Sequence, residues 1–135
     1  MIEDKLPKEL LEKTSKDGNE LAWKLNDVEE VVVTAEKLGL ANLGGQAQFI
    51  FPEGIYELYW IEIDTSGKNQ DEDWLQYVNR SNHEFLRLFK EKVLKTDFLK
   101  EAKNWPALKA KIDQSINILD YLYFVIYFVD EDVPK

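Results

Sequence analysis

The stretch that decides the fold is QAQFIFPEGIYELYWIEID, residues 46–64. Two segments that favour strands, 46–51 and 55–64, flank the turn residues Pro52-Glu53-Gly54, so the stretch predicts an antiparallel hairpin. With a two-residue loop at Glu53-Gly54, one side of the hairpin is apolar, and its cross-strand pairs are Phe51 with Tyr56, Phe49 with Leu58, and Ala47 with Trp60. We therefore expect Tyr56 and Trp60 in the core, although a one-residue bulge would change this register.

The other side of this hairpin is mixed in character. It places Ile50, Gln48 and Gln46 opposite Glu57, Tyr59 and Ile61. Such a face is either partly covered by other elements or available to a partner.

Helical patterns lie on both sides of the hairpin. We expect helices over 7–16, from Asn26 or Asp27 to Gly39, from the end of the polar loop 65–73 to about 94, over about 97–103, and from Pro106 onwards. The second has an apolar stripe at 28, 31, 32, 35 and 38. Its three consecutive valines lower helix propensity, so a strand is an alternative there. The third has its stripe at 75, 78, 82, 85, 89 and 93.

The nearly all-apolar segment 119–129 is ambiguous. It is far shorter than the roughly 20 residues of a membrane span. An apolar seam at 108, 112, 116, 119 and 123 favours a helix that continues into the core, whereas the aromatic and β-branched content favours a strand over 123–129. Both remain open, and we favour the helix. The predicted fold is α+β: helices on one face of a small antiparallel sheet built around the hairpin at about 46–64, in a single domain spanning 1–135.

Charge and composition limit the classes of function. Seventeen Lys and Arg against 26 Asp and Glu give a formal net charge of −9. This balance argues against nucleic-acid backbones and anionic membrane surfaces, which require clustered positive charge. The absence of cysteine from the sequence excludes a disulfide scaffold, a thiol nucleophile and any Cys-ligated metal site. The acidic residues at 1–5 are unlike a signal peptide, so we expect a cytoplasmic location.

No motif predicts catalysis. Glu62 and Asp64 lie two apart on one strand, near a cluster at 71–73, and paired carboxylates can hold Mg²⁺ or transfer protons. A strand end that enters a solvated loop explains them equally well. His83 is the one histidine in the sequence, and its place on the long helix predicts an ordinary surface residue. Gly44-Gly45 lacks the rest of a phosphate-binding motif and is typical of close packing. We expect no catalytic residue, no metal site and no cofactor.

Tyrosine among acidic residues is typical of a protein-binding surface. Tyr and Trp are common interface anchors, and surrounding carboxylates steer a partner of opposite charge. Trp74 and Tyr77, at the start of the long helix, are further aromatic candidates. The predicted partner-binding residues are Glu57, Tyr59, Glu62, Asp64, Asp71 and Asp73. The expected partner is a basic protein.

The order of several motifs resembles a known family. A helix that ends in Glu36-Lys37-Leu38-Gly39-Leu40 precedes Leu43-Gly44-Gly45-Gln46 and the hairpin. This order is similar to small bacterial immunity proteins of polymorphic toxin systems, in which a helix opened by Trp-Asn-like residues precedes a Leu-Gly-Gly-Asp-Val strand start. The matching segments are Trp23-Lys24-Leu25-Asn26, Leu43-Gly44-Gly45, Glu57-Leu58-Tyr59-Trp60 and Trp74-Leu75-Gln76-Tyr77-Val78, within about 23–89. Gln46 replaces the family's acidic residue, so no functional residue is carried over.

The resemblance implies a non-catalytic, cytoplasmic protein that binds and blocks a cognate toxin. With the negative charge, it leads us to expect an acidic inhibitor that sterically covers a basic toxin domain. The alternative is a cytoplasmic interaction or accessory domain of other purpose, which could form a homodimer through the hairpin edge or its mixed face.

Overall fold

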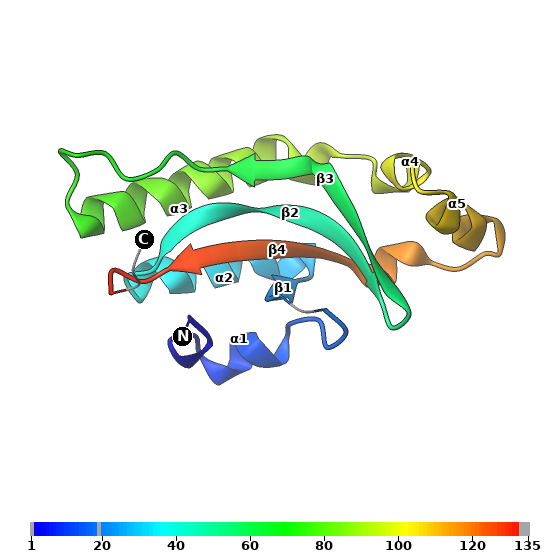
Figure 1. Ribbon diagram of the computed structural model, residues 1–135, viewed down its shortest axis with the longest axis horizontal. Helices are drawn as coiled ribbons and strands as arrows, with labels where there is room; N and C mark the ends of the chain where they lie inside the picture. Colours follow the sequence, from blue (N-terminus) through cyan, green and yellow to red (C-terminus); the bar gives the residue numbers. More distant parts are fainter. Residues whose placement is uncertain (1, 19, 133–135) are drawn as a thin grey trace.

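A computed structural model describes residues 2–18 and 20–132 of the chain (Figure 1). The strands are β1 (Ala22–Trp23), β2 (Ala41–Phe51), β3 (Gly54–Asp64) and β4 (Leu122–Val129). The helices are α1 (Lys8–Glu12), α2 (Val28–Lys37), α3 (Trp74–Glu91), α4 (Phe98–Ala102) and α5 (Pro106–Asp113). Short 3-10 helices lie at Ile2–Asp4, Leu25–Asp27, Val93–Lys95 and Ile118–Tyr121.

The described strands form one antiparallel sheet in the order β1-β4-β2-β3. The last strand of the chain therefore lies between the first two. α2 and α3 run behind the long strands, while α4 and α5 lie near the hairpin end (Figure 1). Side chains from these helices join the inward side of the sheet in one apolar core. The predicted α+β fold, with helices on one face of a sheet built around the hairpin, is confirmed.

The favoured interpretation of 119–129 as helix is wrong. α5 ends at Asp113, and Ser115 adopts a positive φ of 65°, which breaks the helical path. The chain then enters β4, whose aromatic and β-branched residues suit the pleated surface of a sheet. The apolar seam predicted for one long helix is therefore divided between α5 and a strand. Among residues 2–18 and 20–132, no helix combines the length and apolarity needed to cross a bilayer.

The hairpin forms where expected, but its register differs. The loop is Pro52-Glu53, so Phe51 pairs with Gly54 and the partners of Phe49 and Ala47 are Tyr56 and Leu58. An irregularity follows, since Gln46 pairs with Glu62 and residues 59–61 have no partner on β2 in the described sheet. This bulge carries Trp60 out of the core, and its side chain is 38% exposed. The expected burial of Trp60 is wrong, whereas Leu58 is buried and Tyr56 packs against the core.

The helices use most of the predicted apolar stripes. In α2 the stripe is buried except at its end, where Leu38 is 44% exposed. Gly39 follows with a φ of 78°, as a C-terminal cap glycine requires. In α3 the first position, Leu75, is 70% exposed, while Val78, Asn82, Phe85 and Phe89 are buried, as is Val93 beyond it. The first helix is shorter than the predicted 7–16, because it ends at Glu12.

Candidate binding face of the sheet

The sheet turns a second face away from α2 and α3, and we call it the open face. Directly paired residues point to the same side of a sheet, so the register defines its members. They are Gln46, Gln48 and Ile50 on β2, Ile55, Glu57, Glu62 and Asp64 on β3, and Tyr123, Val125 and Tyr127 on β4. Glu20, from the chain before β1, also lies on this face. The chain before β1 leans on part of this face, where Ala22, Ile50 and Val125 form a small buried cluster.

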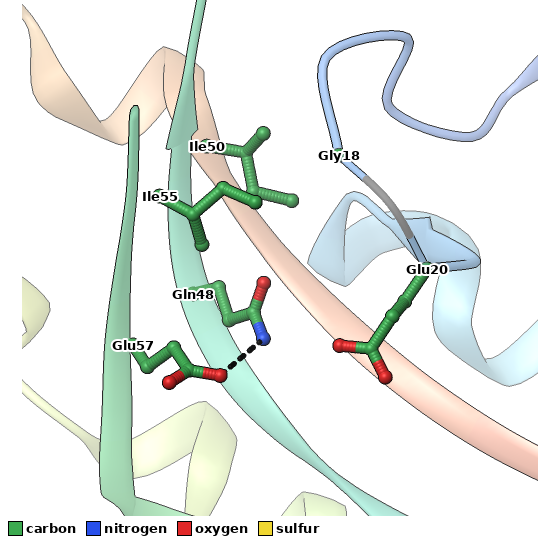
Figure 2. A pocket seen from close by; sticks show the side chains of 6 residues that line it. All are labelled: Gly18, Glu20, Gln48, Ile50, Ile55 and Glu57. Atoms are coloured by element: carbon green, nitrogen blue, oxygen red, sulfur yellow. Dashed lines mark hydrogen bonds between the residues drawn. The ribbon is translucent and has the colours of Figure 1, made fainter. Parts of the chain in front are cut away.

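A cleft of about 220 Å³ lies between this covering segment and the hairpin (Figure 2). We call it the acidic cleft, and it is lined by Gly18, Glu20, Gln48, Ile50, Ile55 and Glu57. Figure 2 shows the carboxylates of Glu20 and Glu57 approaching from opposite sides, with the Gln48 amide between them. Ile50 and Ile55 lie beside each other at one end. The cleft thus combines two negative groups with an apolar wall.

Two glutamines of β2 hold the Glu57 carboxylate in place. Gln46 donates from Nε2 to Oε1 of Glu57 at 2.9 Å, and Gln48 donates from Nε2 to the same oxygen at 3.4 Å. The Gln48 side chain is almost completely buried, at 2% exposure. These two hydrogen bonds therefore hold the Glu57 carboxylate at the mouth of the cleft.

Tyr127 brings a phenol to the same two glutamates. Burial, hydrogen bonding with Glu20 and the charges of Glu20 and Glu57 raise the pKa of Tyr127 to about 12. The phenol is therefore uncharged at neutral pH and adds no negative charge to the face. The shared influence of both carboxylates on one phenol shows that Glu20, Glu57 and Tyr127 converge, although they are far apart in sequence.

The carboxylates of the open face have no cationic neighbours within ion-pair distance. In the described part of the chain, Glu20, Glu57, Glu62 and Asp64 form no ion pair. Some acidic residues elsewhere do have such neighbours: Glu53 lies 2.5 Å from Lys111, and Asp130 lies 2.9 Å from Lys5. The open face therefore presents four carboxylates whose charge no described Lys or Arg balances by direct contact.

A second, wider cleft of about 740 Å³ lies between the β3 bulge and the α4–α5 connection. We call it the aromatic cleft, and it is lined by Tyr59, Trp60, Glu101, Asn104, Trp105 and Pro106. The rings of Tyr59 and Trp60 meet edge to face with centroids 5.0 Å apart. Trp105 donates from Nε1 to the backbone carbonyl of Glu57 at 3.1 Å. Glu57 therefore contributes its side chain to one cleft and its backbone to the boundary of the other.

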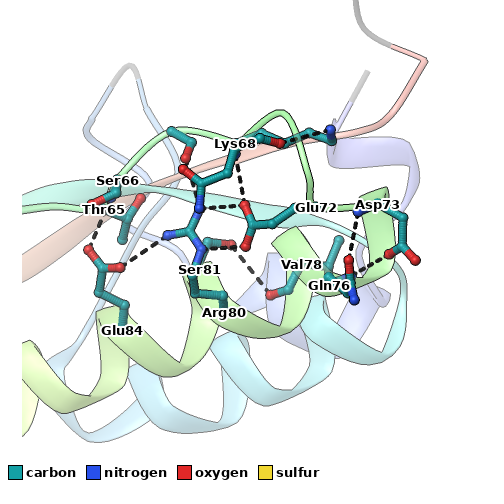
Figure 3. A network of polar contacts seen from close by, with 12 residues as sticks. Thr65, Ser66, Lys68, Glu72, Asp73, Gln76, Val78, Arg80, Ser81 and Glu84 are labelled. Carbon is teal, nitrogen blue, oxygen red and sulfur yellow. Dashed lines mark hydrogen bonds and ion pairs between the residues drawn. The ribbon is translucent and has the colours of Figure 1, made fainter.

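The structure brings together only part of the predicted binding surface. Glu57, Glu62 and Asp64 share the open face, and Tyr59 lies beside it in the aromatic cleft, 64% exposed. Asp71 is exposed in the loop before α3. Asp73 is the N-cap of α3 (Figure 3). Its Oδ1 accepts from the Gln76 backbone N–H at 2.8 Å, and its own backbone N–H donates to Oε1 of Gln76 at 2.8 Å. Its role is structural, because a helix start requires such an acceptor.

The aromatic candidates of the long helix also serve packing. Tyr77 is 3% exposed, and Trp74 donates from Nε1 to the Gly39 carbonyl at 2.8 Å. His83 is a surface residue, as predicted, with Nε2 3.3 Å from Oε2 of Glu36. Among the side chains that the structure describes, no three from His, Cys, Asp or Glu are grouped as metal ligands.

Two residues in and beside the acidic cleft, Glu20 in its lining and Tyr127 next to it, were not identified from the sequence patterns. Tyr127 would have been found from strand alternation over 122–129, which places it on the side opposite Phe124, Ile126 and Phe128. Glu20 lies in a loop and reaches the cleft through the pairing of β1 with β4. No local pattern identifies it. In comparisons with protein-family models, curated proteins and solved structures, nothing matches this chain.

Proposed function

We propose that this chain is a non-catalytic binding protein of the immunity type, which sterically blocks a basic toxin domain. The observation that carries the proposal is the open face, where Glu20, Glu57, Glu62 and Asp64 lie together without a cationic neighbour in the described chain. Carboxylates left unpaired on one face favour a partner that supplies the positive charge.

The mechanism follows from electrostatics and shape. A net charge of −9 attracts a basic domain over a distance comparable with the Debye length, about 10 Å at 0.1 M salt. Contact then places the acidic face against the basic cleft of the toxin and excludes its substrate. Exposed aromatic rings at Tyr59 and Trp60 can supply the apolar contact that charge alone does not. Binding should therefore be fast and sensitive to salt.

Self-association is the alternative, and two features count against it. A symmetric dimer through the open face would oppose the same four carboxylates, which repel one another. At the β3 edge of the described sheet, the bulge at 59–61 and the Trp105 hydrogen bond to Glu57 interrupt the ladder that a second strand would need.

The test is capture followed by rescue. The tagged chain is incubated with lysate of its own cells at about 20 mM and about 300 mM salt. The Debye length is several-fold shorter at the higher concentration. We expect one basic protein, retained at low salt and lost at high salt. Expressed alone, that protein should arrest growth, and this chain should restore it. Recovery of the tagged chain alone, or of a partner without toxicity, contradicts the proposal.

Charge reversal locates the surface. Glu57→Lys with Glu62→Lys should abolish capture and rescue while leaving the melting temperature close to that of the wild type, because both side chains are exposed. The matched control is Glu9→Lys with Glu12→Lys on the exposed side of α1, which changes the net charge equally. Equal loss of rescue in both pairs would show that net charge, and not the open face, determines binding.

A further inference from the structure

We propose that the acidic cleft is a receptacle for one arginine side chain of the partner protein. The inference rests on the proposed function and names the contact that anchors the partner. Its basis is a built pocket with a buried amide, which distinguishes it from a patch of surface carboxylates.

The size of the cleft suits a single side chain. Pockets for drug-sized ligands occupy roughly 300–1,000 Å³. The acidic cleft is smaller, at about 220 Å³, and it is open on one side. A side chain that projects from a partner surface can enter it, and the partner backbone can remain outside.

The polar lining consists of hydrogen-bond acceptors that have no cationic partner. Glu20 and Glu57 present carboxylates from opposite walls (Figure 2). Between them, Gln48 uses its Nε2 on Glu57, and its Oε1 accepts no hydrogen bond from any described residue, although the side chain is 2% exposed. Gln48 Oε1 is not among the buried atoms that lack a partner, so water reaches it in the cleft, and a group that displaces this water must itself donate a hydrogen bond. Two carboxylates and a carbonyl oxygen therefore favour a group that donates and carries positive charge.

Arginine fits this lining better than lysine does. The guanidinium is planar, offers five donors in a fixed fork and loses its hydration more readily than an ammonium. Its donors are spread over three nitrogens and can reach acceptors on opposite walls, whereas the three donors of a lysine ammonium all lie on one nitrogen. The methylene stem would lie along Ile50 and Ile55, which form the apolar wall of the cleft.

The test uses a small probe and no toxin. N-acetyl-arginine amide is titrated into the ¹⁵N-labelled chain at low salt, and the side-chain amide signals of Gln46 and Gln48 are followed by NMR. We expect saturable shifts at millimolar probe, the range of a single weak anchor. N-acetyl-lysine amide should bind more weakly, and the uncharged isostere N-acetyl-citrulline amide should produce no saturable shift. Equal responses to arginine and citrulline, or to arginine and lysine, overturn the inference, and so does a lack of saturation.

Two variants distinguish binding in the acidic cleft from non-specific electrostatic attraction to the face. Glu20→Gln with Glu57→Gln should weaken the probe about tenfold or more, because it removes both charged acceptors. Glu62→Gln, on the same face but outside the cleft lining, should bind the probe as the wild type does. Equal weakening by Glu62→Gln would contradict a specific pocket. Probe binding without growth rescue would remove the proposed function alone, and rescue without probe binding would remove the pocket alone.

Discussion

At the scale of single residues, Arg80 organises the loop between β3 and α3 (Figure 3). Its Nε donates to Oε2 of Glu72 at 2.6 Å, and Nη2 donates to Oε1 of Glu72 at 2.9 Å and to the Gly67 carbonyl at 2.8 Å. Nη1 donates to Oε2 of Glu84 at 3.2 Å. The guanidinium thus fixes a polar loop that has little apolar contact to hold it. A two-point contact with one carboxylate is the strongest geometry that such a pair can adopt.

The Glu72 carboxylate makes this contact sensitive to acid. The Arg80 hydrogen bonds, with the backbone N–H of Asn69, lower the pKa of Glu72 from 4.5 to about 2. A carboxyl whose pKa is lower in the folded state stabilises the fold fully above its unfolded pKa. That contribution is lost as the pH falls from about 4.5 through about 2.

Replacing Glu72 should remove this pH-dependent contribution. We expect Glu72→Gln to be less stable than the wild type at pH 7, and the difference should shrink steadily as the pH falls from about 5 to about 2.5. Urea unfolding at a series of pH values measures it. Glu9→Gln, at an exposed position of α1, is the control and should show a small difference that does not vary in this way. A Glu72→Gln difference that is the same at pH 7 and pH 2.5 would contradict the assignment.

At the scale of elements, the central strand β2 contains two glycines at positions where the neighbouring strands leave no room for a side chain. Gly44 has a φ of 107°, and a Cβ there would lie 2.0 Å from the Ile63 carbonyl oxygen. At Gly45 a Cβ would lie 1.9 Å from the Val125 carbonyl oxygen. Both obstacles are backbone atoms of the neighbouring strands, so they cannot rotate away. The Gly44-Gly45 pair is thus explained by close packing, as its sequence context indicated.

Alanine at Gly45 should therefore disrupt the sheet between β2 and β4. We expect Gly45→Ala to lower the free energy of unfolding by about 2 kcal/mol or more, since overpacking against backbone forces the strands apart. Thermal and urea unfolding measure the loss. Gly67→Ala is the matched control, because a Cβ at Gly67 meets nothing within 4 Å. A Gly45→Ala protein as stable as Gly67→Ala would show that the β2–β4 spacing differs from that described.

Elements whose signals are local could be predicted from the sequence. The hairpin has a turn between two strand-forming runs, and α2 has its stripe and cap glycine. β4 could not be predicted, because its aromatic and β-branched residues fit either a helix seam or a strand until its partners β1 and β2 are known. The β3 bulge could not be predicted either, since an unpaired segment leaves the alternation on either side intact. The sequence pattern therefore placed Trp60 in the core, where it does not lie.

The same distinction explains the candidate site. Strand alternation alone places Glu57 on the side opposite Glu62 and Asp64, and it is the β3 bulge that brings all three to one face. Tyr127 depended on the misinterpreted strand, and Glu20 arrives from a loop through topology alone. Asp73 has the residue type of a binding surface, but the start of α3 uses its carboxylate. Acidic composition indicates the class of partner, and only the pairing of distant strands defines where that partner would bind.

At the scale of the whole molecule, the net charge and the obstructed sheet edge predict the oligomeric state in solution. The chain carries a net charge of −9, with four unpaired carboxylates of the described chain on the open face, so like molecules repel. The described sheet has its long edge at β3, where the bulge and the Trp105 hydrogen bond to Glu57 obstruct a further strand, and its other edge at the two-residue strand β1. Both features favour a monomer over a dimer formed through the face or through the edge.

Light scattering coupled to gel filtration tests this state. We expect the wild type to elute as a monomer at neutral pH at both about 20 mM and about 150 mM salt, since screening at the higher concentration still leaves the β3 edge obstructed. Trp105→Ala frees the Glu57 carbonyl, so this variant should associate more readily at the higher salt, where repulsion is weaker. Asn104→Ala, at the neighbouring position of the aromatic cleft, leaves the edge covered and should remain monomeric. A wild-type dimer at micromolar concentration would instead favour self-association as the purpose of this face, because repulsion among its carboxylates would then have been overcome by contacts between two copies.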